Sequence, residues 1–307
     1  MKKDVISVLD LRADISDILG SALELKKRND KSGQQLKGRT LGMIFEKSST
    51  RTRVSFEAGM LQLGGHTIYL SQRDSQLGRG ETIGDTAKVL SRYVDGIVYR
   101  AFSHANMLEL ARAATVPVIN ALDDLEHPCQ IAADLMTIME RKGSFQGLKL
   151  AYIGDGNNVC NSLSLGAAIV GMDFMAATPP EHRPDPGAIA SARSIAEKNG
   201  AVSEVVTSPQ EAARGADVIY TDTWISMGQE DEGREKMRAL APYHVSQELM
   251  SMANKGSIFM HCLPAHRGSE VAAEVIDGPQ SVVFDQAENR MHAQKAILIK
   301  LMAPSAR

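Results

Sequence analysis

The chain alternates between two kinds of segment, and this alternation limits its possible folds more than any other feature. Short apolar runs are separated by longer stretches in which apolar residues recur at helical spacing. The strand-like runs are residues 40–45, 67–70, 96–99 and 116–119, and then 148–153, 173–176, 218–221, 257–261 and 281–284. Strands that alternate with helices pair in parallel and are covered by helices. The sequence therefore predicts an α/β protein with parallel sheets.

The pattern restarts after Gly147, which indicates two domains. A chain of 307 residues that is 43% hydrophobic can bury two cores. We expect a first domain over residues 1–140 and a second over 147–289, each a parallel sheet flanked by helices. The helical stretch 128–141 is expected to join them. The last helical run, 291–302, has an apolar face, and we expect residues 290–307 to pack back on the first domain.

Composition argues against several classes of partner. The formal net charge is -3, so the basic excess of nucleic-acid binders is missing. The start of the chain lacks a signal-peptide core, and no apolar run approaches membrane-spanning length. Cys129, Cys160 and Cys262 are far apart and lack CxxC spacing, which predicts neither a disulfide framework nor a zinc cluster. We expect a cytoplasmic protein with no nucleic-acid or membrane partner.

The segment FEKSSTRTRVSF, residues 45–56, concentrates hydrogen-bond donors where a helix begins after the first strand-like run. A helix start offers unpaired N–H groups and the positive end of the helix dipole. Further donors come from the side chains of Ser49, Thr50, Arg51 and Thr52. Ligands of parallel-sheet domains gather at the carboxyl ends of strands. The segment therefore predicts a phosphate site, whereas Arg53 is assigned to a surface pair with Glu57.

In the second half, YIGDGNNVCNSL runs from a strand through Gly154 and Gly156 into a helix. By itself this resembles a dinucleotide-binding turn, but the third glycine is missing and no acidic residue follows at the next strand end. An NAD-type oxidoreductase or nucleotide-binding module is therefore the alternative from a different class.

Six motifs occur together: SSTRTRVSFE at 48–57, HPCQ at 127–130, DGNNVCNS at 155–162, DTWISMG at 222–228, HCLP at 261–264 and ENR at 288–290. In this order they resemble the ornithine carbamoyltransferases of the aspartate/ornithine carbamoyltransferase family, over nearly the whole chain. The resemblance implies transfer of the carbamoyl group of carbamoyl phosphate to the side-chain amine of L-ornithine, giving L-citrulline and phosphate. It also implies a homotrimer or a multiple of trimers, with no metal and no organic cofactor.

The resemblance implies a set of carbamoyl phosphate-binding residues: Ser49, Thr50, Arg51, Thr52, Gln76, Arg100, His127, Gln130, Cys262, Leu263 and Arg290. The first four would hold the phosphate, while Arg100 and His127 would donate to the carbonyl oxygen as it gains charge. Gln130 would orient the NH2 group, and Arg290 is expected to open the last helix. Gln76 would act on a neighbouring subunit's site. Its loop, residues 71–81, contains no lysine, unlike that of aspartate carbamoyltransferases.

Ornithine binding is implied for Asn158, Asp222, Ser226 and Met227. The catalytic set would be Arg100, His127, Asp222 and Cys262. The attacking amine must be neutral although its pKa in water is about 10.4, so we place Asp222 on the α-ammonium group rather than on that amine. Cys262 is expected near the attacking amine, without a covalent role, and Cys129 and Cys160 are expected to be buried. A carbamoyltransferase for another amine or amino acid, such as putrescine or an acylated ornithine, is the alternative within the class.

Residues 228–240 follow the last of the ornithine motifs and combine two glycines with many charges. Such a segment has little apolar surface to bury. We expect it to close when both substrates are bound.

Overall fold

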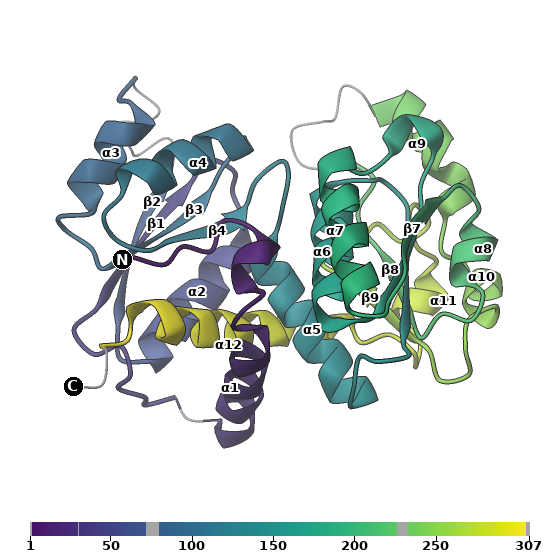
Figure 1. Cartoon of the computed structure of the whole chain (residues 1–307), viewed down its shortest axis with the longest axis horizontal. Helices are drawn as coiled ribbons and strands as arrows, with labels where there is room; N and C mark the ends of the chain where they lie inside the picture. Colours follow the sequence, from purple (N-terminus) through teal and green to yellow (C-terminus); the bar gives the residue numbers. More distant parts are fainter. Residues whose placement is uncertain (1, 30, 72–79, 226–232, 305–307) are drawn as a thin grey trace. The chain divides into compact units, whose positions relative to one another are not determined.

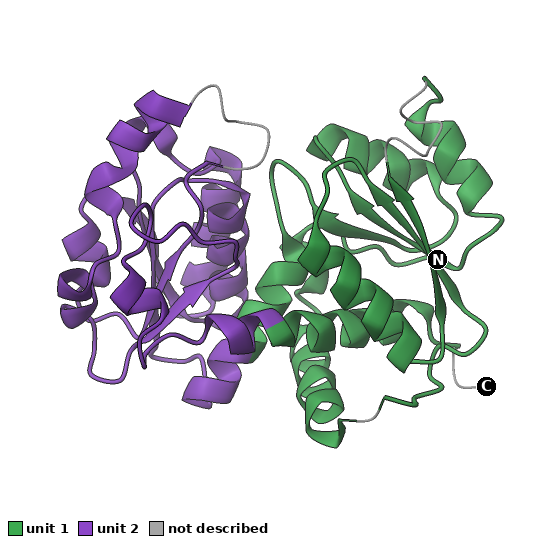
Figure 2. Ribbon diagram, turned by 180° about the vertical axis from the view of Figure 1, so that it is seen from behind, with its two compact units in different colours: residues 1–136, 288–307 green, residues 137–287 purple. Residues whose placement is uncertain are grey.

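The computed structural model describes residues 2–29, 31–71, 80–225 and 233–304, and it divides into two compact units (Figures 1 and 2). Unit 1 comprises Met1–Met136 with Glu288–Arg307, and unit 2 comprises Thr137–Ala287. Each unit has one all-parallel sheet flanked by helices, so the predicted two-domain α/β class is confirmed. The chain passes between the units within α5 (Pro128–Lys142) and again within α12 (Val283–Met302).

Unit 1 is built around a four-stranded sheet of order β2-β1-β3-β4. Its strands are β1 (Thr40–Phe45), β2 (His66–Ser71), β3 (Gly96–Arg100) and β4 (Val118–Leu122). Its other helical elements are η1 (Val8–Leu11), α1 (Ile15–Arg28), α2 (Thr50–Gln62), α3 (Ile83–Leu90) and α4 (His104–Ala113). Helices α3 and α4 cover one face of the sheet, and α2 and α12 cover the other (Figure 1).

The core of unit 1 explains this layering. Strand β3 is buried along its whole length, and Ile97 and Tyr99 belong to the apolar cluster that includes Met107 of α4. On the opposite face α2 packs closely on α12, because a Cβ at Gly59 would lie 3.2 Å from the side chain of Lys295 on α12. This contact places α2 and α12 in the same layer.

Unit 2 contains a five-stranded parallel sheet of order β7-β6-β5-β8-β9. Its strands are β5 (Lys149–Ile153), β6 (Asp173–Ala177), β7 (Ser203–Val206), β8 (Val218–Thr221) and β9 (Ile258–His261). Its helical elements are α6 (Asn158–Val170), η3 (Pro180–His182), α7 (Pro186–Lys198), α8 (Pro209–Ala213), α9 (Gly233–Leu240), η5 (Ala241–Tyr243), α10 (Gln247–Ser251) and α11 (Ala273–Ile276).

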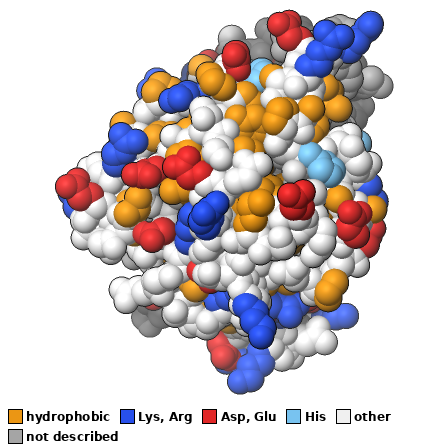
Figure 3. All heavy atoms as spheres, turned by 90° about the vertical axis from the view of Figure 1, so that its right-hand side faces the viewer, with side chains coloured by type: hydrophobic (Ala, Val, Ile, Leu, Met, Phe, Trp, Pro, Cys, Tyr) orange, Lys and Arg blue, Asp and Glu red, His pale blue; other side chains and the backbone are white. Residues whose placement is uncertain are grey.

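Helices α6 and α7 lie on one face of this sheet, and α8, α10 and α11 lie on the other (Figure 1). The second face buries an apolar cluster formed by side chains such as Ile219, Phe259 and Leu249. On the surface shown in Figure 3, acidic and basic side chains are interspersed among apolar ones, and no broad basic patch is formed there. Among the described residues, no helix is both long and apolar enough to cross a membrane.

Three local predictions differ from the structure. Residues 281–284 do not form a strand: Ser281 makes a single bridge to Phe259, and α12 begins at Val283. A short apolar run fits a strand and a buried helical turn equally well, so periodicity misassigned it. Arg290 consequently lies inside α12 and does not open it. Strand β7 was not predicted, because it is a four-residue edge strand that is buried only at Ser203.

Candidate active site

The start of α2 is organised by its own hydroxyl groups. Ser49 is the N-cap residue, and its Oγ accepts a hydrogen bond from the Thr52 N–H at 3.3 Å. The same hydroxyl donates to Thr52 Oγ1 at 3.0 Å. Thr50 is exposed and Arg51 partly exposed, and the Arg51 side chain forms no hydrogen bond or ion pair with the described residues. The helix start therefore presents backbone and side-chain donors together.

Arg53 lies outside this group, as predicted. Its Nε donates to Glu57 Oε1 at 2.9 Å, and the two side chains are 46% and 34% exposed. The guanidinium also lies 3.8 Å from the centre of the Tyr69 ring. The interpretation of Arg53 as a surface pair is confirmed.

A buried polar chain joins three helices of unit 1. Arg290, on α12, donates through Nη2 to Thr52 Oγ1 and through Nη1 to Gln130 Oε1, each at 2.7 Å. Gln130, in the first turn of α5, donates through Nε2 to Asp134 Oδ1 at 2.8 Å. Because an arginine can only donate and a carboxylate can only accept, both ends of the Gln130 amide are fixed. Thr52, Gln130 and Arg290 are each at most 4% exposed, and the structure brings these three candidate residues into contact.

Arg100 and His127 complete this side of unit 1. Arg100 is the last residue of β3 and His127 directly precedes α5, and they are 8% and 3% exposed. Burial, reinforced by the positive charges of Arg290 and Arg100, holds the pKa of His127 well below its usual value. His127 is therefore a neutral imidazole at physiological pH, which has one N–H to donate.

In unit 2, Asp222 is the centre of a second polar group. It follows β8 and is 5% exposed. Asn157 Nδ2 donates to Asp222 Oδ2 at 2.7 Å, and Cys262 Sγ donates to Asp222 Oδ1 at 2.9 Å. Asn158 is the first residue of α6, next to this contact. Asp222 and Cys262, predicted from separate motifs, are thus direct neighbours.

Cys262 and Leu263 lie in a turn that follows β9 and is held by a buried histidine. The Leu263 N–H donates to His261 Nδ1 at 2.9 Å, and His261 Nε2 lies 3.5 Å from Glu270 Oε1. Burial acts to raise the pKa of Glu270, but hydrogen bonds from His261 and the His266 N–H outweigh it, so this pKa is lowered. Leu263 has φ of 60°, and the peptide bond to Pro264 is cis. The contact to His261 supports this left-handed backbone, which non-glycine residues rarely adopt.

Asp222, His261 and Cys262 also have the residue types of a metal site, with their ligand atoms within 4.8 Å of one another. The contacts just described use these atoms within the protein. Asp222 accepts from Asn157 and Cys262, and His261 Nδ1 accepts from a backbone N–H. A metal ion would have to displace these hydrogen bonds.

The turn of the dinucleotide-like motif is covered by the chain itself. The Gly156 N–H donates to the carbonyl of His182 at 2.9 Å, and a Cβ on Gly156 would lie 2.4 Å from the backbone of Arg183. A dinucleotide pyrophosphate needs open access to such a turn and to its N–H groups. This geometry argues against the oxidoreductase alternative.

Two residues in these contacts were not selected from the sequence. Asn157 caps α6 by accepting from the N–H groups of Val159 and Cys160, and its position just before a helix start was a usable signal. Asp134 lies four residues after Gln130 on one helix, which is a contact spacing.

The remaining predicted residues and cysteines divide into two groups. Gln76, Ser226 and Met227 lie outside the described residues, as does the first part of the segment expected to close. The second part of that segment is α9, where Lys236 Nζ forms an ion pair with Asp155 Oδ2 at 2.7 Å. Cys129 and Cys160 are buried, as predicted, and burial raises the pKa of the Cys129 thiol to about 12.

Two family models match the chain. Residues 3–140 match "Aspartate/ornithine carbamoyltransferase, carbamoyl-P binding domain", and residues 146–301 match "Aspartate/ornithine carbamoyltransferase, Asp/Orn binding domain". The order of the two matches is that of units 1 and 2, except that residues 288–301 group with unit 1 in the structure.

Individual relatives agree with this. The chain is 53% identical to the catabolic ornithine carbamoyltransferase of Thermoplasma volcanium, over 98% of this chain and 99% of the relative. It is 56% identical to the ornithine carbamoyltransferase of Methanothermobacter thermautotrophicus, again over 98% and 99%. The solved structure of ornithine carbamoyltransferase from Pyrococcus furiosus matches with a TM-score of 0.95 at 49% identity, covering 100% of this chain and 98% of that one. The chain belongs to the aspartate/ornithine carbamoyltransferase family.

Proposed function

We propose that this protein transfers the carbamoyl group of carbamoyl phosphate to the side-chain amine of L-ornithine, giving L-citrulline and phosphate. Relatives that are 53% and 56% identical over almost their full length carry the name ornithine carbamoyltransferase. The structural observation that carries the proposal is the buried contact of Arg290 with Thr52 and Gln130. It joins two helix N-termini, at α2 and α5, through a cationic side chain, which is an arrangement suited to a phosphate and an adjacent carbonyl group.

Unit 1 would bind carbamoyl phosphate. In this proposal Ser49, Thr50, Arg51 and Thr52 hold the phosphate, together with the N–H groups of α2. The carbonyl oxygen, which gains negative charge as the tetrahedral intermediate forms, receives hydrogen bonds from Arg100 and His127. The lowered pKa of His127 supports a role as a neutral hydrogen-bond donor, because the imidazole then carries one N–H and no extra proton to give to the substrate. The Gln130 amide oxygen, which already accepts a hydrogen bond from Arg290, would accept a second one from the carbamoyl NH2 group and so orient it.

Unit 2 would bind ornithine through Asn158, Asp222, Ser226 and Met227. Asp222, oriented by Asn157, would pair with the α-ammonium group. Cys262 and the carbonyl of Leu263 would act on the attacking amine and the carbamoyl group. That amine must lose its proton before it attacks, and its removal from water favours the neutral form. The amine nitrogen then bonds to the carbonyl carbon, the bond from that carbon to the phosphate oxygen breaks, and the second amine proton leaves with phosphate. No metal or organic cofactor takes part in this scheme.

A citrulline assay with a panel of acceptors tests the substrate. We expect rapid product formation with L-ornithine and at least 100-fold lower kcat/KM with putrescine, N-acetylornithine, L-lysine and L-aspartate. Putrescine keeps both amines of ornithine but lacks the α-carboxylate group that the neighbours of Asp222 would bind, and aspartate lacks the side-chain amine. Comparable rates with any of these acceptors, or no citrulline at all, would contradict the assignment.

We also propose that the enzyme is a homotrimer or a multiple of trimers, with Gln76 completing a neighbour's site. Unit 1 exposes apolar side chains on α2 and on β2, an edge strand of its sheet: Val54 is 55%, Leu61 73% and Ile68 46% exposed. Such a face is typical of contacts between subunits. Leu61→Lys should dissociate the assembly in sedimentation experiments, while Tyr93→Lys, at a position of the same 73% exposure, should not.

Subunit mixing tests the shared site itself. Gln76→Ala and Arg51→Ala subunits, each expected to have little activity alone, should recover part of the activity when they assemble together. Mixed trimers that remain inactive would argue that Gln76 acts elsewhere.

Finally, we place the enzyme in the cytoplasm, as a protein whose partners are small-molecule substrates and its own copies. The net charge of -3 and three cysteines that form no disulfide among the described residues support this assignment.

A further inference from the structure

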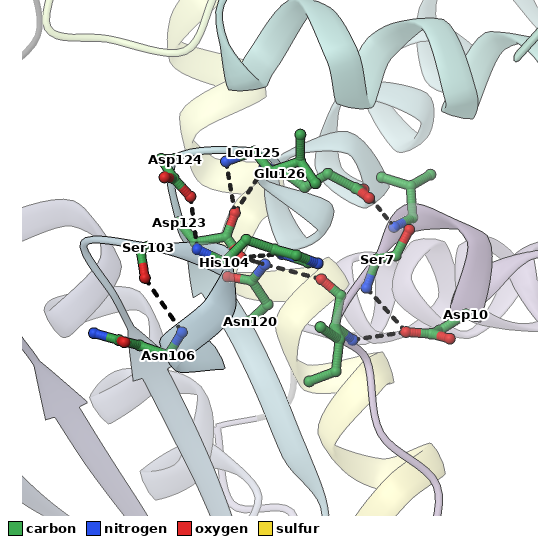
Figure 4. A network of polar contacts seen from close by, with 12 residues as sticks. Ser7, Asp10, Ser103, His104, Asn106, Asn120, Asp123, Asp124, Leu125 and Glu126 are labelled. Atoms are coloured by element: carbon green, nitrogen blue, oxygen red, sulfur yellow. Dashed lines mark hydrogen bonds and ion pairs between the residues drawn. The ribbon is translucent and has the colours of Figure 1, made fainter. Parts of the chain in front are cut away.

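The turn that carries His127 is shaped by one buried carboxylate. Asp123 follows β4 and is fully buried. Its Oδ1 accepts hydrogen bonds from the N–H groups of Leu125 at 2.9 Å and Glu126 at 2.7 Å (Figure 4). Its own N–H donates to the Glu126 carbonyl at 3.0 Å. These three bonds fix the backbone up to the residue before His127.

The other oxygen of the same carboxylate ties the turn to two further elements. Asp123 Oδ2 accepts from Asn120 Nδ2 at 2.9 Å and lies 2.8 Å from Nδ1 of His104 (Figure 4). The same Asn120 nitrogen donates to the carbonyl of Ile6 at 2.8 Å. His104, the first residue of α4, also donates its backbone N–H to Asp124 Oδ1 at 2.6 Å. His104 therefore holds the turn at two adjacent residues.

We propose that Asp123 is a positioning residue for His127 in the carbamoyl transfer, and that His104 holds the Asp123 carboxylate in place. The inference rests on the proposed function, since it assumes that His127 donates to carbamoyl phosphate. Neither residue is expected to touch the substrate. Both residues act through the turn at residues 123–126, which fixes the positions of His127 and of the N-terminus of α5. A turn tied by four donors to one carboxylate has little freedom, and small displacements of a donor from a developing charge are costly to catalysis.

The charges around His104 make its part in this arrangement dependent on pH. The hydrogen bond with Asp123 raises the pKa of His104, and the nearby carboxylates of Glu126 and Asp124 add to the effect against partial burial. From the segment after β1, Lys47 faces Asp123 and Asp124. Because the folded-state pKa is raised, the stabilisation from the charged pair is complete below the pKa of a free histidine. It is lost as pH rises through the raised value.

Glu126 ties the same turn to the N-terminal segment. Its Oε2 accepts from the Val8 N–H at 2.8 Å. Burial raises the pKa of Glu126, partly offset by hydrogen bonds from Ser7 and Val8. This second link does not involve His104, so a substitution of His104 removes one tie and leaves the turn otherwise anchored.

The test compares His104→Gln and Asp123→Asn with Asp217→Asn in the full-length enzyme. Asp217 is a matched control in unit 2, because its carboxylate also accepts a backbone N–H, from Lys149 at 3.0 Å, and a side-chain amide N–H, from Asn254 at 2.9 Å. We expect kcat/KM for carbamoyl phosphate to fall about tenfold in His104→Gln and about 100-fold in Asp123→Asn, with KM for ornithine within twofold of wild type. The control should stay within twofold for both substrates.

The pH profile separates positioning from general stability. The ratio of wild-type to His104→Gln kcat/KM for carbamoyl phosphate should be largest near pH 6 and should shrink toward pH 9. A constant ratio, an unchanged His104→Gln enzyme, or equal losses for both substrates would overturn the inference. If wild type itself forms no citrulline, the proposed function fails instead. If Asp123→Asn does not fold, the His104→Gln profile alone decides the question.

Discussion

Replacing Asn157 by aspartate tests how the Asp222 carboxylate is held. Asn157 Oδ1 caps α6, accepting from the Val159 N–H at 3.0 Å and the Cys160 N–H at 3.1 Å. Its Nδ2 donates to Asp222 Oδ2 at 2.7 Å. Asn157→Asp keeps the size of the side chain and the capping oxygen, and it exchanges only the donor that faces Asp222 for a carboxylate oxygen.

The expected magnitude follows from that distance. Two carboxylate oxygens 2.7 Å apart repel by about 6 kcal/mol at an effective dielectric constant of about 20. Because about 1.4 kcal/mol changes a pKa by one, this repulsion raises the pKa of the introduced carboxyl group from about 4 to about 8. The group therefore keeps its proton up to about pH 8. While it is protonated, it donates to Asp222 as the asparagine does. Above that pH both groups are charged, and Asp222 is driven away from its position.

Calorimetry with L-norvaline is the appropriate assay, because norvaline keeps the α-amino and α-carboxyl groups of ornithine but lacks the reactive amine. With carbamoyl phosphate present, the variant should bind norvaline within about threefold of wild type at pH 6. Its affinity should then fall at least tenfold relative to wild type by pH 9. Asn157→Ala, which has no donor at any pH, should be weak throughout. The reasoning is refuted if Asn157→Asp follows wild type at every pH, or if it is already as weak as Asn157→Ala at pH 6.

Three further predictions follow from other contacts. Arg51→Ala should weaken carbamoyl phosphate binding at least tenfold in calorimetry, since a charge-assisted hydrogen bond contributes about 1.5–3 kcal/mol, and near-normal affinity would contradict the phosphate site. Arg290→Lys keeps the charge but cannot reach both Thr52 and Gln130, so kcat/KM for carbamoyl phosphate should fall about 10- to 100-fold; an unchanged value would show that the double contact is dispensable. Lys236→Met leaves the Asp155 carboxylate buried without its cation, which further raises the pKa of Asp155 above the value already raised by burial. The ionised carboxylate then destabilises the fold, so the loss of thermal stability should be larger at pH 8 than at pH 5. Equal losses at the two pH values would argue against the ion pair.

The sequence predicted what depends on local patterns. Period and length located eight of the nine strands found in the described residues, because a strand buried in a parallel sheet is a short apolar run between helical segments. The helix cap at Ser49 and the donors that follow it could also be predicted from the sequence, because a helix start is set by neighbouring residues alone. The family resemblance added the functional assignments, and the chain's membership of that family is now established.

Other features depended on long-range packing. Residues 281–284 were mistaken for a strand because their apolar pattern does not reveal that α12 begins there. The contact between Thr52 and Arg290 joins positions 238 residues apart, and nothing near either residue specifies it. The same is true of Glu126 and Val8, which are 118 residues apart.

The sequence by itself thus determined the type of fold, the helix starts and the kinds of donor available for chemistry, because these are set by interactions within a few residues. Only the tertiary structure decided which carboxylate faces which distant donor: Asp222 with Asn157 and Asp123 with His104. A buried polar group must find a partner, but the partner is chosen by how strands and helices pack, and that choice is made across the whole of a unit.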